Sequence, residues 1–541
     1  MNKVILTFAL VSAVEALVAQ SALSGSSIFV YVLAGLAIVL FFSMIIKVAN
    51  NLIGIEAQRQ GINMEDDGMT LLPGLQHFFK GKAPEFTMGT PTHLLNKGHD
   101  ILLEGEATGA AAPATGVTRY AVQPPNFRGL KPIPKMTVEV GDTVKAGDQL
   151  FFDKGMPDVV FAAPVSGEVI EINRGAKRAI TEVVILADKE QTSRSYEVPN
   201  LAEASRADLV EFIKGSGAWS LFRQRPFNIV ASPNETPRDI FVSTFDTAPL
   251  APDANVVVAG QEVAFQRGVD VLAQLTDGDV YLGLDARGDV APAAVFAEAA
   301  NAKKHYFRGK HPAGNVGVQI HHIAPVGGTD IIWTLGVQDV ITLGKLFLNG
   351  VYDASRVVAL AGAELKEPKY VQTYAGANID ELLSGNIATD NVRIISGDVL
   401  SGAKKDANSY LDFYDDQISV IEEGDFYELF GWLAPIELRP TISNTFPNFI
   451  FSDVKFRANT NTHGEKRAFV VTNDYEQVMP MDVYPAHIMK SVLVNDIERM
   501  EGLGILELVE EDVALCEFVC VSKQPLQQIL RRGLDTIRDQ G

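Results

Sequence analysis

A long apolar run occupies Ile28–Ile46 and contains no charged residue. In an α-helix the 19 residues of this run span roughly 28 Å, about the thickness of the hydrocarbon core of a bilayer. A helix that is apolar on every side has no polar face to present to water. The pattern therefore predicts a transmembrane helix over residues 27–47, with a buried core helix as the alternative.

A shorter apolar run, Val4–Val14, follows the positive charge of Lys3 and precedes small residues around Ala19. This arrangement is typical of a signal peptide, although Glu15 departs from it. The alternative is a first transmembrane helix that forms a hairpin with the next one. We therefore interpret residues 1–21 as a signal-peptide-like segment or a first membrane span.

Basic residues follow the predicted span, whereas none lies between Lys3 and the span. They are Lys47, Arg59, Lys80 and Lys82. Because positive charges are retained on the cytoplasmic side of a membrane, this asymmetry puts everything after Lys47 in the cytoplasm. Residues 48–92 are predicted to be a linker.

Short runs of strand-like residues follow one another across Met136–Ile172, separated by Gly-Asp turns at Gly141 and Gly147. Gly with Asp supplies the backbone conformations that tight turns require. The predicted strands are Met136–Val140, Gln149–Phe152, Val159–Ala162 and Glu168–Ile172.

The pattern VGDxVxAGDxL followed by APVSGxV resembles the barrel-sandwich fold of biotinyl and lipoyl carrier domains, and we assign residues 93–200 to it. A carrier domain attaches its cofactor to a lysine at the tip of the central hairpin. Counting back from Pro164 puts Met156 at this position, whereas Lys154 lies two residues away and has no neighbouring methionine. The domain is therefore predicted to be unmodified and to serve as a rigid docking module.

Helix-like and strand-like segments alternate over residues 201–352, which is typical of a Rossmann-like doubly wound sheet. The predicted helices are Asp208–Gly215, Glu262–Gln274 and Pro292–Ala302, and the predicted strands are Asp239–Ser243 and Val280–Leu284.

No glycine-rich phosphate loop follows a strand in this region. The natural position is occupied by Gly217-Ala218-Trp219, and Trp219 is too bulky where a backbone must approach a pyrophosphate. Arg223 and Arg225 follow this loop. They could hold an anion, or they could form structural ion pairs.

Composition and charge remove other classes of function. The net charge is −21, which repels phosphate backbones, so nucleic-acid binding is not expected. The only cysteines, Cys516 and Cys520, are too few for a disulfide framework or a four-iron cluster and are predicted to be core residues on one helix face. His321 and His322, interpreted as part of a strand, would point to opposite faces, and no metal site is predicted.

A basic turn, Arg174 to Arg178, is unusual on so acidic a chain. It is interpreted either as a solvated loop or as a contact to a partner protein or a lipid headgroup.

Motifs from about Leu94 to the C-terminus resemble one family, the NqrA component of the sodium-translocating NADH:quinone oxidoreductase, which is related to the RnfC component of the Rnf complex. The segments that carry the resemblance are INRGAKR (172–178), SGAWSLFRQRPF (216–227), FDTAPLAP (245–252), HPAG (311–314), QDVITLGKLFLNG (338–350), RIISGDVLSG (393–402), ISVIEEG (418–424), ELFGW (428–432), DYEQVMPMD (474–482) and the tail 512–521.

The resemblance implies an α/β multidomain protein in a six-subunit complex of the bacterial inner membrane that couples NADH oxidation and quinone reduction to Na⁺ export. It implies a β-grasp module over residues 353–405, with strands in Val357–Ile379 broken at Gly362, Pro368 and Gly376. A C-terminal region follows over residues 406–541 and is predicted to be helical from about 484, in Tyr484–Met500 and Pro525–Arg538.

The family further implies a peripheral subunit on the cytoplasmic side, with flavins and iron–sulfur centres in partner subunits and contacts to the membrane component NqrB and to NqrC. Together with the missing phosphate loop and cysteines, this predicts a cofactor-free accessory subunit, not catalytic alone, with a role in quinone binding or access. Aromatic rings can stack on a quinone and arginine can bond its carbonyl. The residues expected to contact quinone or a partner are Phe127, Arg128, Trp219, Arg223, Arg225 and Phe227.

Two other functions remain as alternatives. A periplasmic adaptor of an efflux system also combines an N-terminal anchor with a barrel-sandwich domain, but it requires a long helical hairpin between the two halves. A biotin carrier of a decarboxylase sodium pump requires the attachment lysine.

Overall fold

The computed structural model describes residues 83–428, 438–442 and 454–540, and, nearer the N-terminus, residues 32, 34–38, 41–46, 48–49 and 52. The chain divides into two compact units, Met1–Lys82 and Ala83–Gly541. The prediction for residues 1–21 lies outside the described residues, as does most of the predicted linker.

The described positions between 32 and 52 are helical and carry exposed apolar side chains such as Phe41 and Met44. Within the part of the chain that is described, no helix is both long enough and apolar enough to cross a bilayer. Much of the predicted span over residues 27–47 falls outside that part.

Two antiparallel sheets form the barrel-sandwich domain. One has the order β3-β9-β8-β5 and the other β4-β6-β7. Their bounds are β3 (Arg119–Val122), β4 (Lys135–Met136), β5 (Thr143–Val144), β6 (Gln149–Asp153), β7 (Met156–Ala162), β8 (Gly167–Arg174) and β9 (Ile180–Ala187), with short 3-10 turns η2 (Pro124–Asn126) and η3 (Ala176–Arg178). The three later predicted strands are confirmed as β6, β7 and β8.

The predicted strand Met136–Val140 is wrong, because β4 ends at Met136. The chain turns instead: the amide of Glu139 donates to Asp142 Oδ2 at 2.8 Å, and Gly141 has a φ of 97°, in the left-handed region that glycine adopts readily.

The tip of the β6–β7 hairpin also differs from the prediction. Asp153 pairs with Met156, so the turn consists of Lys154 and Gly155, and Met156 begins β7. Irregular register along this pair shifts the tip away from the position obtained by counting from Pro164. The lysine therefore lies at the tip after all, although its neighbours Asp153 and Gly155 are unlike those of biotinyl domains. A two-residue turn leaves no room for the helical hairpin of an efflux adaptor.

A seven-stranded sheet, called the central sheet below, has the strand order β1-β14-β13-β12-β15-β10-β11. The first five strands are parallel, and β10 and β11 extend the sheet antiparallel. The strands are β1 (Thr92–Leu94), β10 (Arg223–Arg225), β11 (Ile229–Val230), β12 (Asp239–Ser243), β13 (Val280–Asp285), β14 (Lys303–Arg308) and β15 (Ile332–Leu335).

Helices cover both faces of this sheet, because the side chains along each strand point alternately to one face and to the other. Ile240 and Val242 share one apolar cluster with α7 and α10, whereas Phe241 packs with Ile320 of α9 on the other face. The helices are α5 (Arg206–Gly215), α6 (Ala254–Val258), α7 (Glu262–Leu272), α8 (Ala294–Ala297), α9 (Val316–Ile323) and α10 (Val337–Asn349), with the 3-10 turns η1 (Glu85–Thr87) and η4 (Ala218–Leu221). The predicted β12, β13, α5 and α7 are confirmed.

Two predictions in this region are wrong. The helix Pro292–Ala302 shrinks to the single turn α8, because Asn301 adopts a left-handed φ of 58° and β14 begins at Lys303. His321 and His322 lie on the helix α9 and not on a strand.

A six-stranded sheet, β19-β18-β20-β16-β17-β2, forms the next domain. Its elements are β2 (Thr108–Pro113), β16 (Ser355–Ala361), β17 (Lys369–Tyr374), β18 (Val392–Ser396), β19 (Ala403–Lys405), β20 (Gln417–Glu422) and α11 (Ile379–Leu382). The predicted strand breaks are confirmed: Gly362 and Pro368 lie between β16 and β17, and Gly376 follows β17, with both glycines at positive φ. Two strands, β2 and β20, come from outside the predicted range 353–405.

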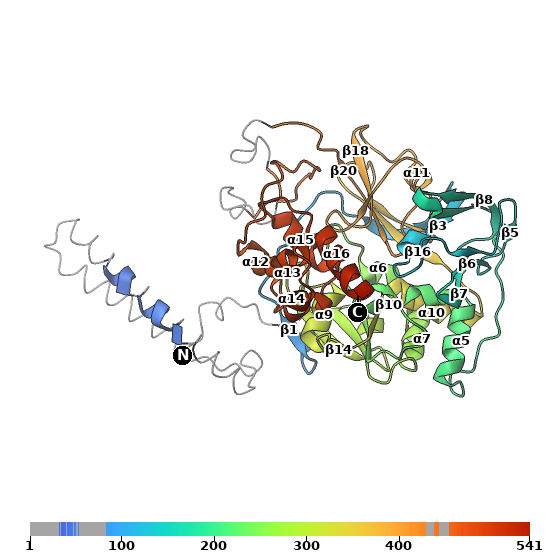
Figure 1. Cartoon of the computed structure of the whole chain (residues 1–541), viewed down its shortest axis with the longest axis horizontal. Coiled ribbons are helices and arrows are strands. Elements are labelled where there is room, and N and C mark those ends of the chain that lie inside the picture. The colour runs from blue at the N-terminus through green and yellow to red at the C-terminus, as the bar shows by residue number, and fades with distance from the viewer. Residues whose placement is uncertain are drawn as a thin grey trace. The chain divides into compact units, whose positions relative to one another are not determined.

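The C-terminal helices α12–α16, coloured red in Figure 1, pack around their own apolar cluster. They are α12 (Asp474–Val478), α13 (Pro485–Leu493), α14 (Ile497–Gly502), α15 (Glu510–Val519) and α16 (Leu526–Gln540), with a 3-10 turn η6 (Ile505–Glu507). The last predicted helix is confirmed as α16. The prediction of one helix over Tyr484–Met500 is wrong, because Asn495, at a φ of 57°, separates α13 from α14.

The segment before the barrel-sandwich joins the other domains together. Its strand β1 pairs in parallel with β14, its strand β2 pairs in parallel with β17, and Leu103 bridges to Phe456. The single stretch Thr92–Pro113 therefore connects the central sheet, the six-stranded sheet and the C-terminal region.

Helices α7 and α10 approach closely because each contributes a glycine to their contact. A Cβ on Gly344 would lie 1.7 Å from the carbonyl oxygen of Ala264, and a Cβ on Gly268 would lie 2.1 Å from that of Val340. No side chain fits at either position without separating the helices.

We expect Gly344→Ala to lower the free energy of unfolding by about 1–3 kcal/mol or more, because the added methyl group meets backbone. Chemical denaturation monitored by circular dichroism measures this change. Gly502→Ala is the matched control, since a Cβ at Gly502 meets nothing within 4 Å. An equal loss in both variants would contradict the packing argument.

Candidate functional site

The central sheet has a topological switch point between β12 and β15, because β13 and β14 follow on one side of β12 and β15 on the other. Open α/β sheets bind ligands in the crevice outside the carboxyl ends of their strands at such a point. Here the loops that leave β12, β13 and β14 carry Asp246, Arg287 and His311.

His311 is buried, with 4% of its surface exposed. Its Nδ1 lies 3.1 Å from Thr247 Oγ1, which also accepts the amide of Gly314 at 2.9 Å, and its own amide donates to Asp100 Oδ1 at 2.8 Å. Its Nε2 is buried without a hydrogen-bond partner among the described residues. Loss of hydration lowers the pKa of His311, so the imidazole is neutral at physiological pH.

Asp246 is accessible to solvent, yet desolvation raises its pKa to about 6, with smaller contributions from Asp398 and Glu511. Arg287, on the loop after the next strand, pairs with Asp285 at 2.7 Å, and its guanidinium lies 5.5 Å from the ring centre of Phe245.

The charged groups described at these strand ends are mainly acidic, and Arg287 already pairs with a carboxylate. Such a lining disfavours the phosphates of a flavin or a dinucleotide. The described residues contain no group of three or more His, Cys, Asp or Glu side chains with the geometry of a metal site.

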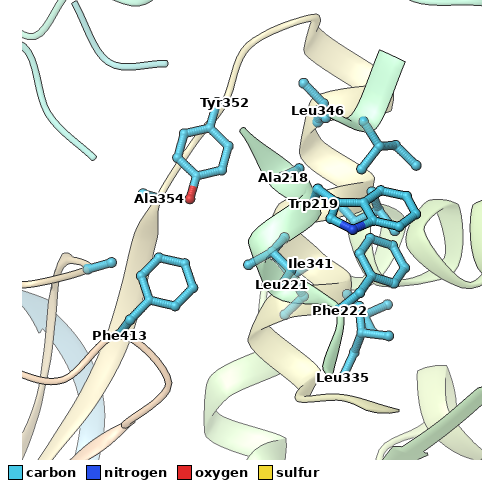
Figure 2. Close-up of a cluster of buried hydrophobic side chains, with 14 of the residues drawn as sticks. Ala218, Trp219, Leu221, Phe222, Leu335, Ile341, Leu346, Tyr352, Ala354 and Phe413 are labelled. Atoms are coloured by element: carbon cyan, nitrogen blue, oxygen red, sulfur yellow. The ribbon is translucent and has the colours of Figure 1, made fainter. Parts of the chain in front are cut away.

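Trp219 fills the position where a phosphate loop was sought (Figure 2). It is fully buried in η4, its indole Nε1 donates to the carbonyl of Ala231 at 2.8 Å, and its ring lies against Phe222 with 5.2 Å between centroids. The preceding Gly217 has a φ of 86°, and a Cβ there would lie 2.4 Å from Ala162 of the barrel-sandwich domain. This loop is packed as a joint between domains and leaves no space for a pyrophosphate.

Arg225 holds the first turn of α15 against the central sheet. It is 2% exposed and reaches Glu511 at 2.8 Å and Asp512 at 3.2 Å. Asp512 also accepts the amide of Val509 at 2.9 Å, as an acidic residue does at a helix N-terminus. Burial raises the pKa of Asp512 to about 6, and Arg225 acts in the opposite direction. For Arg225 the sequence left two alternatives, an anion site and a structural ion pair, and the structure supports the ion pair.

Arg128 contacts α15 directly through Glu510, whereas Phe227 is linked to Glu510 by way of Arg531. Arg128 reaches Glu510 at 2.6 Å and its side chain is 42% exposed. Arg531 of α16 also pairs with Glu510, at 2.8 Å, and donates to the carbonyl of Phe227 at 2.9 Å.

The remaining predicted site residues lie elsewhere. Phe127 is 2% exposed and packs on Phe161 and Phe413, with 4.8 Å between ring centroids in each pair. Arg223 lies over the ring of Tyr414 at 5.1 Å. The structure therefore brings Arg128, Arg225 and Phe227 together at the start of α15, whereas Phe127 and Trp219 are in the interior.

Asp246, Arg287 and His311 are not among the site residues that the sequence predicted, although Asp246 and His311 lie within the family motifs 245–252 and 311–314. Their common signal was available: each follows a segment that the pattern predicted or implied to be a parallel strand, and such ends meet at one edge of a sheet.

Both cysteines are buried and free, as predicted for core residues. Cys516 lies within α15, but Cys520 is the residue after its last turn and accepts the hydroxyl of Tyr475 at 2.8 Å.

Three histidines from different elements meet at the edge of the central sheet. His93 Nε2 of β1 lies 3.0 Å from His305 Nδ1 of β14, and the rings of His93 and His322 lie 5.9 Å apart. Desolvation, followed by the neighbouring His305 and His322, lowers the pKa of His93 to about 4.

Comparison with known proteins agrees with this architecture. Family models described as the NqrA N-terminal barrel-sandwich hybrid domain, the NqrA second alpha/beta domain and the NQRA C-terminal domain match residues 94–188, 204–352 and 357–407. The NqrA component of the Na(+)-translocating NADH-quinone reductase of Vibrio atlanticus is 39% identical over 450 residues, 83% of this chain and 99% of its own length.

Relatives of the same name from Neisseria meningitidis serogroup B and Alcanivorax borkumensis are 38% and 39% identical, each over 83% of this chain and 99% of their own length. Among solved structures, an NAD⁺-reducing NiFe-hydrogenase aligns over 65% of this chain and 67% of its own, at 10% identity and a TM-score of 0.33.

We expect Arg225→Met to lower the free energy of unfolding by about 3–5 kcal/mol at neutral pH, because it leaves buried carboxylates without a counter-charge. The part of this loss that is due to Asp512 should shrink as the pH falls towards about 6, because Asp512 has a pKa of about 6 beside Arg225 and is protonated still more readily without it. Denaturant unfolding at several pH values measures both effects.

Two variants control this experiment. Adding Asp512→Asn to Arg225→Met should restore much of the stability, and Arg128→Met should cost at most about 1 kcal/mol because this arginine is exposed and Glu510 keeps Arg531. An equal cost for the two arginine variants would refute the assignment of the buried pair.

We also expect His93→Phe to alter the pH dependence of stability. The folded pKa of His93, about 4, lies below the ordinary value of 6.5, so the unfolded chain binds the proton more readily between these values. The parent should therefore lose about 2 kcal/mol more than the variant as the pH falls from 6.5 to 4. Thermal unfolding across this range measures the difference, and parallel pH profiles for the two proteins would contradict it.

Proposed function

From the premise that this chain belongs to the NqrA family of the Na⁺-translocating NADH-quinone reductase, we propose that it is a cofactor-free accessory subunit of that complex. In this role it contributes no redox group and is not catalytic alone. Its partners are the other components of the complex, with NqrB and NqrC as the neighbours, and the flavins and iron–sulfur centres belong to them.

The packing of Trp219 is the observation that supports this proposal most directly. A flavin or dinucleotide needs backbone amides free to approach its phosphates. Here the indole is fully buried, and Gly217 is in contact with another domain. The acidic crevice around Asp246 offers no compensating site for phosphate.

We further propose that residues 27–47 form a transmembrane helix and that the domains after it are cytoplasmic. The uncharged run Ile28–Ile46 and the positive charges that follow it support this arrangement. The three matched family domains begin at residue 94, so the apolar segment precedes all of them. A tether raises the effective concentration of a protein at the membrane without adding contacts.

A role in quinone binding or access is proposed for the cluster at the start of α15. Arg128 has the exposed guanidinium that can bond a quinone carbonyl or a partner carboxylate, and Phe227 lies beside it through their shared contact with Arg531 and Glu510. Phe127, Trp219, Arg223 and Arg225 would then act by holding this edge in place.

The biotin-carrier alternative retains one supporting observation, the exposed Lys154 at the hairpin tip. A streptavidin blot of the protein from its native cells decides between the two, because a positive band requires a biotinylated lysine.

One purification tests the main proposal. The full chain, extracted from membranes with mild detergent, should recover the other subunits and sodium-stimulated NADH:quinone activity. The same chain separated from its partners should show no flavin absorbance and no NADH oxidation. In membranes that have not been extracted with detergent, the chain should remain with the membrane after a carbonate wash. Stoichiometric flavin on the isolated chain would refute the cofactor-free assignment, and release by carbonate would refute the anchor.

A further inference from the structure

Three turns of the barrel-sandwich domain converge at one end of that domain. The amide of Lys131 donates to Asp153 Oδ1 at 3.2 Å, which holds the loop 131–135 against the β6–β7 turn. The next residue, Pro132, accepts the amide of Ile180 at 3.2 Å, which holds the same loop against the base of the β8–β9 turn. The loop therefore lies between the two hairpin tips.

Each of these turns carries exposed cations. We call this group the basic patch; its members are Lys131, Lys135, Lys154, Arg174, Lys177 and Arg178, and all of them are exposed. None forms an ion pair within the described residues, although the chain as a whole has a net charge of −21.

The acidic side chains near these turns form no ion pair with the patch among the described residues. Asp153 is 2% exposed, and its carboxylate accepts the amides of Lys131 and Gly155. Glu171 and Glu182 accept the amide group of Asn173. Asp158 is the exposed carboxylate nearest to the β6–β7 turn in sequence.

The backbone of the β8–β9 turn is strained in a way that presents two cations. Lys177 and Arg178 adopt φ values of 54° and 63°, in the left-handed region that side chains other than Gly, Asn and Asp rarely occupy. Such strain is retained where the surrounding structure enforces it, and it concentrates at functional positions.

An apolar residue stands among these charges. Ile133 is 41% exposed and is fixed between Pro132 and Pro134, so its side chain projects from a stiff loop. Cations around an exposed aliphatic side chain are the pattern of surfaces that rest on anionic membranes. Protein interfaces, in contrast, are depleted in lysine and enriched in aromatic residues, whereas this patch has four lysines and no aromatic ring.

We propose that the basic patch docks on the anionic phospholipid headgroups of the membrane, with Ile133 entering the headgroup layer. This contact orients an acidic protein that the same membrane would otherwise repel. The inference does not depend on the quinone or cofactor assignments above.

Vesicle binding tests the proposal on residues 83–541. These residues form their own compact unit and contain all three matched family domains, so they can be studied without the apolar N-terminus. The probes are vesicles of phosphatidylcholine alone and of phosphatidylcholine with phosphatidylglycerol. We expect binding to the anionic vesicles only, and we expect added salt to weaken it.

Two variants remove cations from different turns. Lys177→Asn with Arg178→Asn keeps residues that tolerate the left-handed backbone, and Lys131→Gln with Lys135→Gln changes no strained position. Each pair should weaken partition to anionic vesicles by about fivefold per removed cation. Lys145→Gln with Lys189→Gln is the matched control, because both exposed lysines lie beyond the opposite end of β9 in the same domain.

Several outcomes would overturn the proposal. Equal binding to neutral and anionic vesicles, unchanged binding in both patch variants, or an equal loss in the control would each do so. If the patch variants of the full chain bind vesicles normally but recover fewer partner proteins from membranes, the patch is a protein interface and the lipid assignment is wrong.

Discussion

The buried contact between Arg225 and the first turn of α15 determines how the C-terminal helices meet the central sheet. A guanidinium that is 2% exposed has no water to replace a lost carboxylate, so Glu511 and Asp512 must stay where they are. Asp512 begins its own helix through the amide of Val509, and it lies so close to Gly317 of α9 that a Cβ there would be 2.5 Å from it. The same few atoms therefore fix a helix start, a domain interface and the wall of the crevice that contains Glu511.

Because Arg225 is held by these two carboxylates, it is not free to bind an anion, which the sequence had suggested as one of its roles. Family resemblance and motif could indicate that Arg225 mattered, but its partners follow it by almost three hundred residues, and no local pattern pairs them. Periodicity predicted α7, β12 and α16 well because their apolar faces repeat locally. It failed at Pro292–Ala302 and at Tyr484–Met500, where Asn301 and Asn495 turn the chain at a left-handed residue within an otherwise helical composition. The hairpin tip at Lys154 was misplaced because irregular strand pairing is invisible to counting.

The central sheet keeps the geometry of a ligand-binding fold while its two characteristic positions have changed in opposite ways. At Trp219 the space is filled and the loop joins two domains. At the carboxyl ends of β12 and β14 a crevice persists, but acidic side chains and a neutral His311 line it. A buried indole at one position and mainly acidic side chains at the other both disfavour bound phosphate, as the proposed cofactor-free role requires.

The segment that carries β1 and β2 has a consequence for the synthesis of the molecule. Both strands leave the ribosome before the barrel-sandwich domain, yet β1 pairs with β14, β2 pairs with β17, and Leu103 meets Phe456. None of these partners exists when the segment appears, so its backbone groups stay unpaired while several hundred further residues are synthesised. Domains of this chain therefore cannot be completed one after another from the N-terminus. The contact of Leu103 waits until Phe456 has been synthesised, so a segment that is made early is incorporated late.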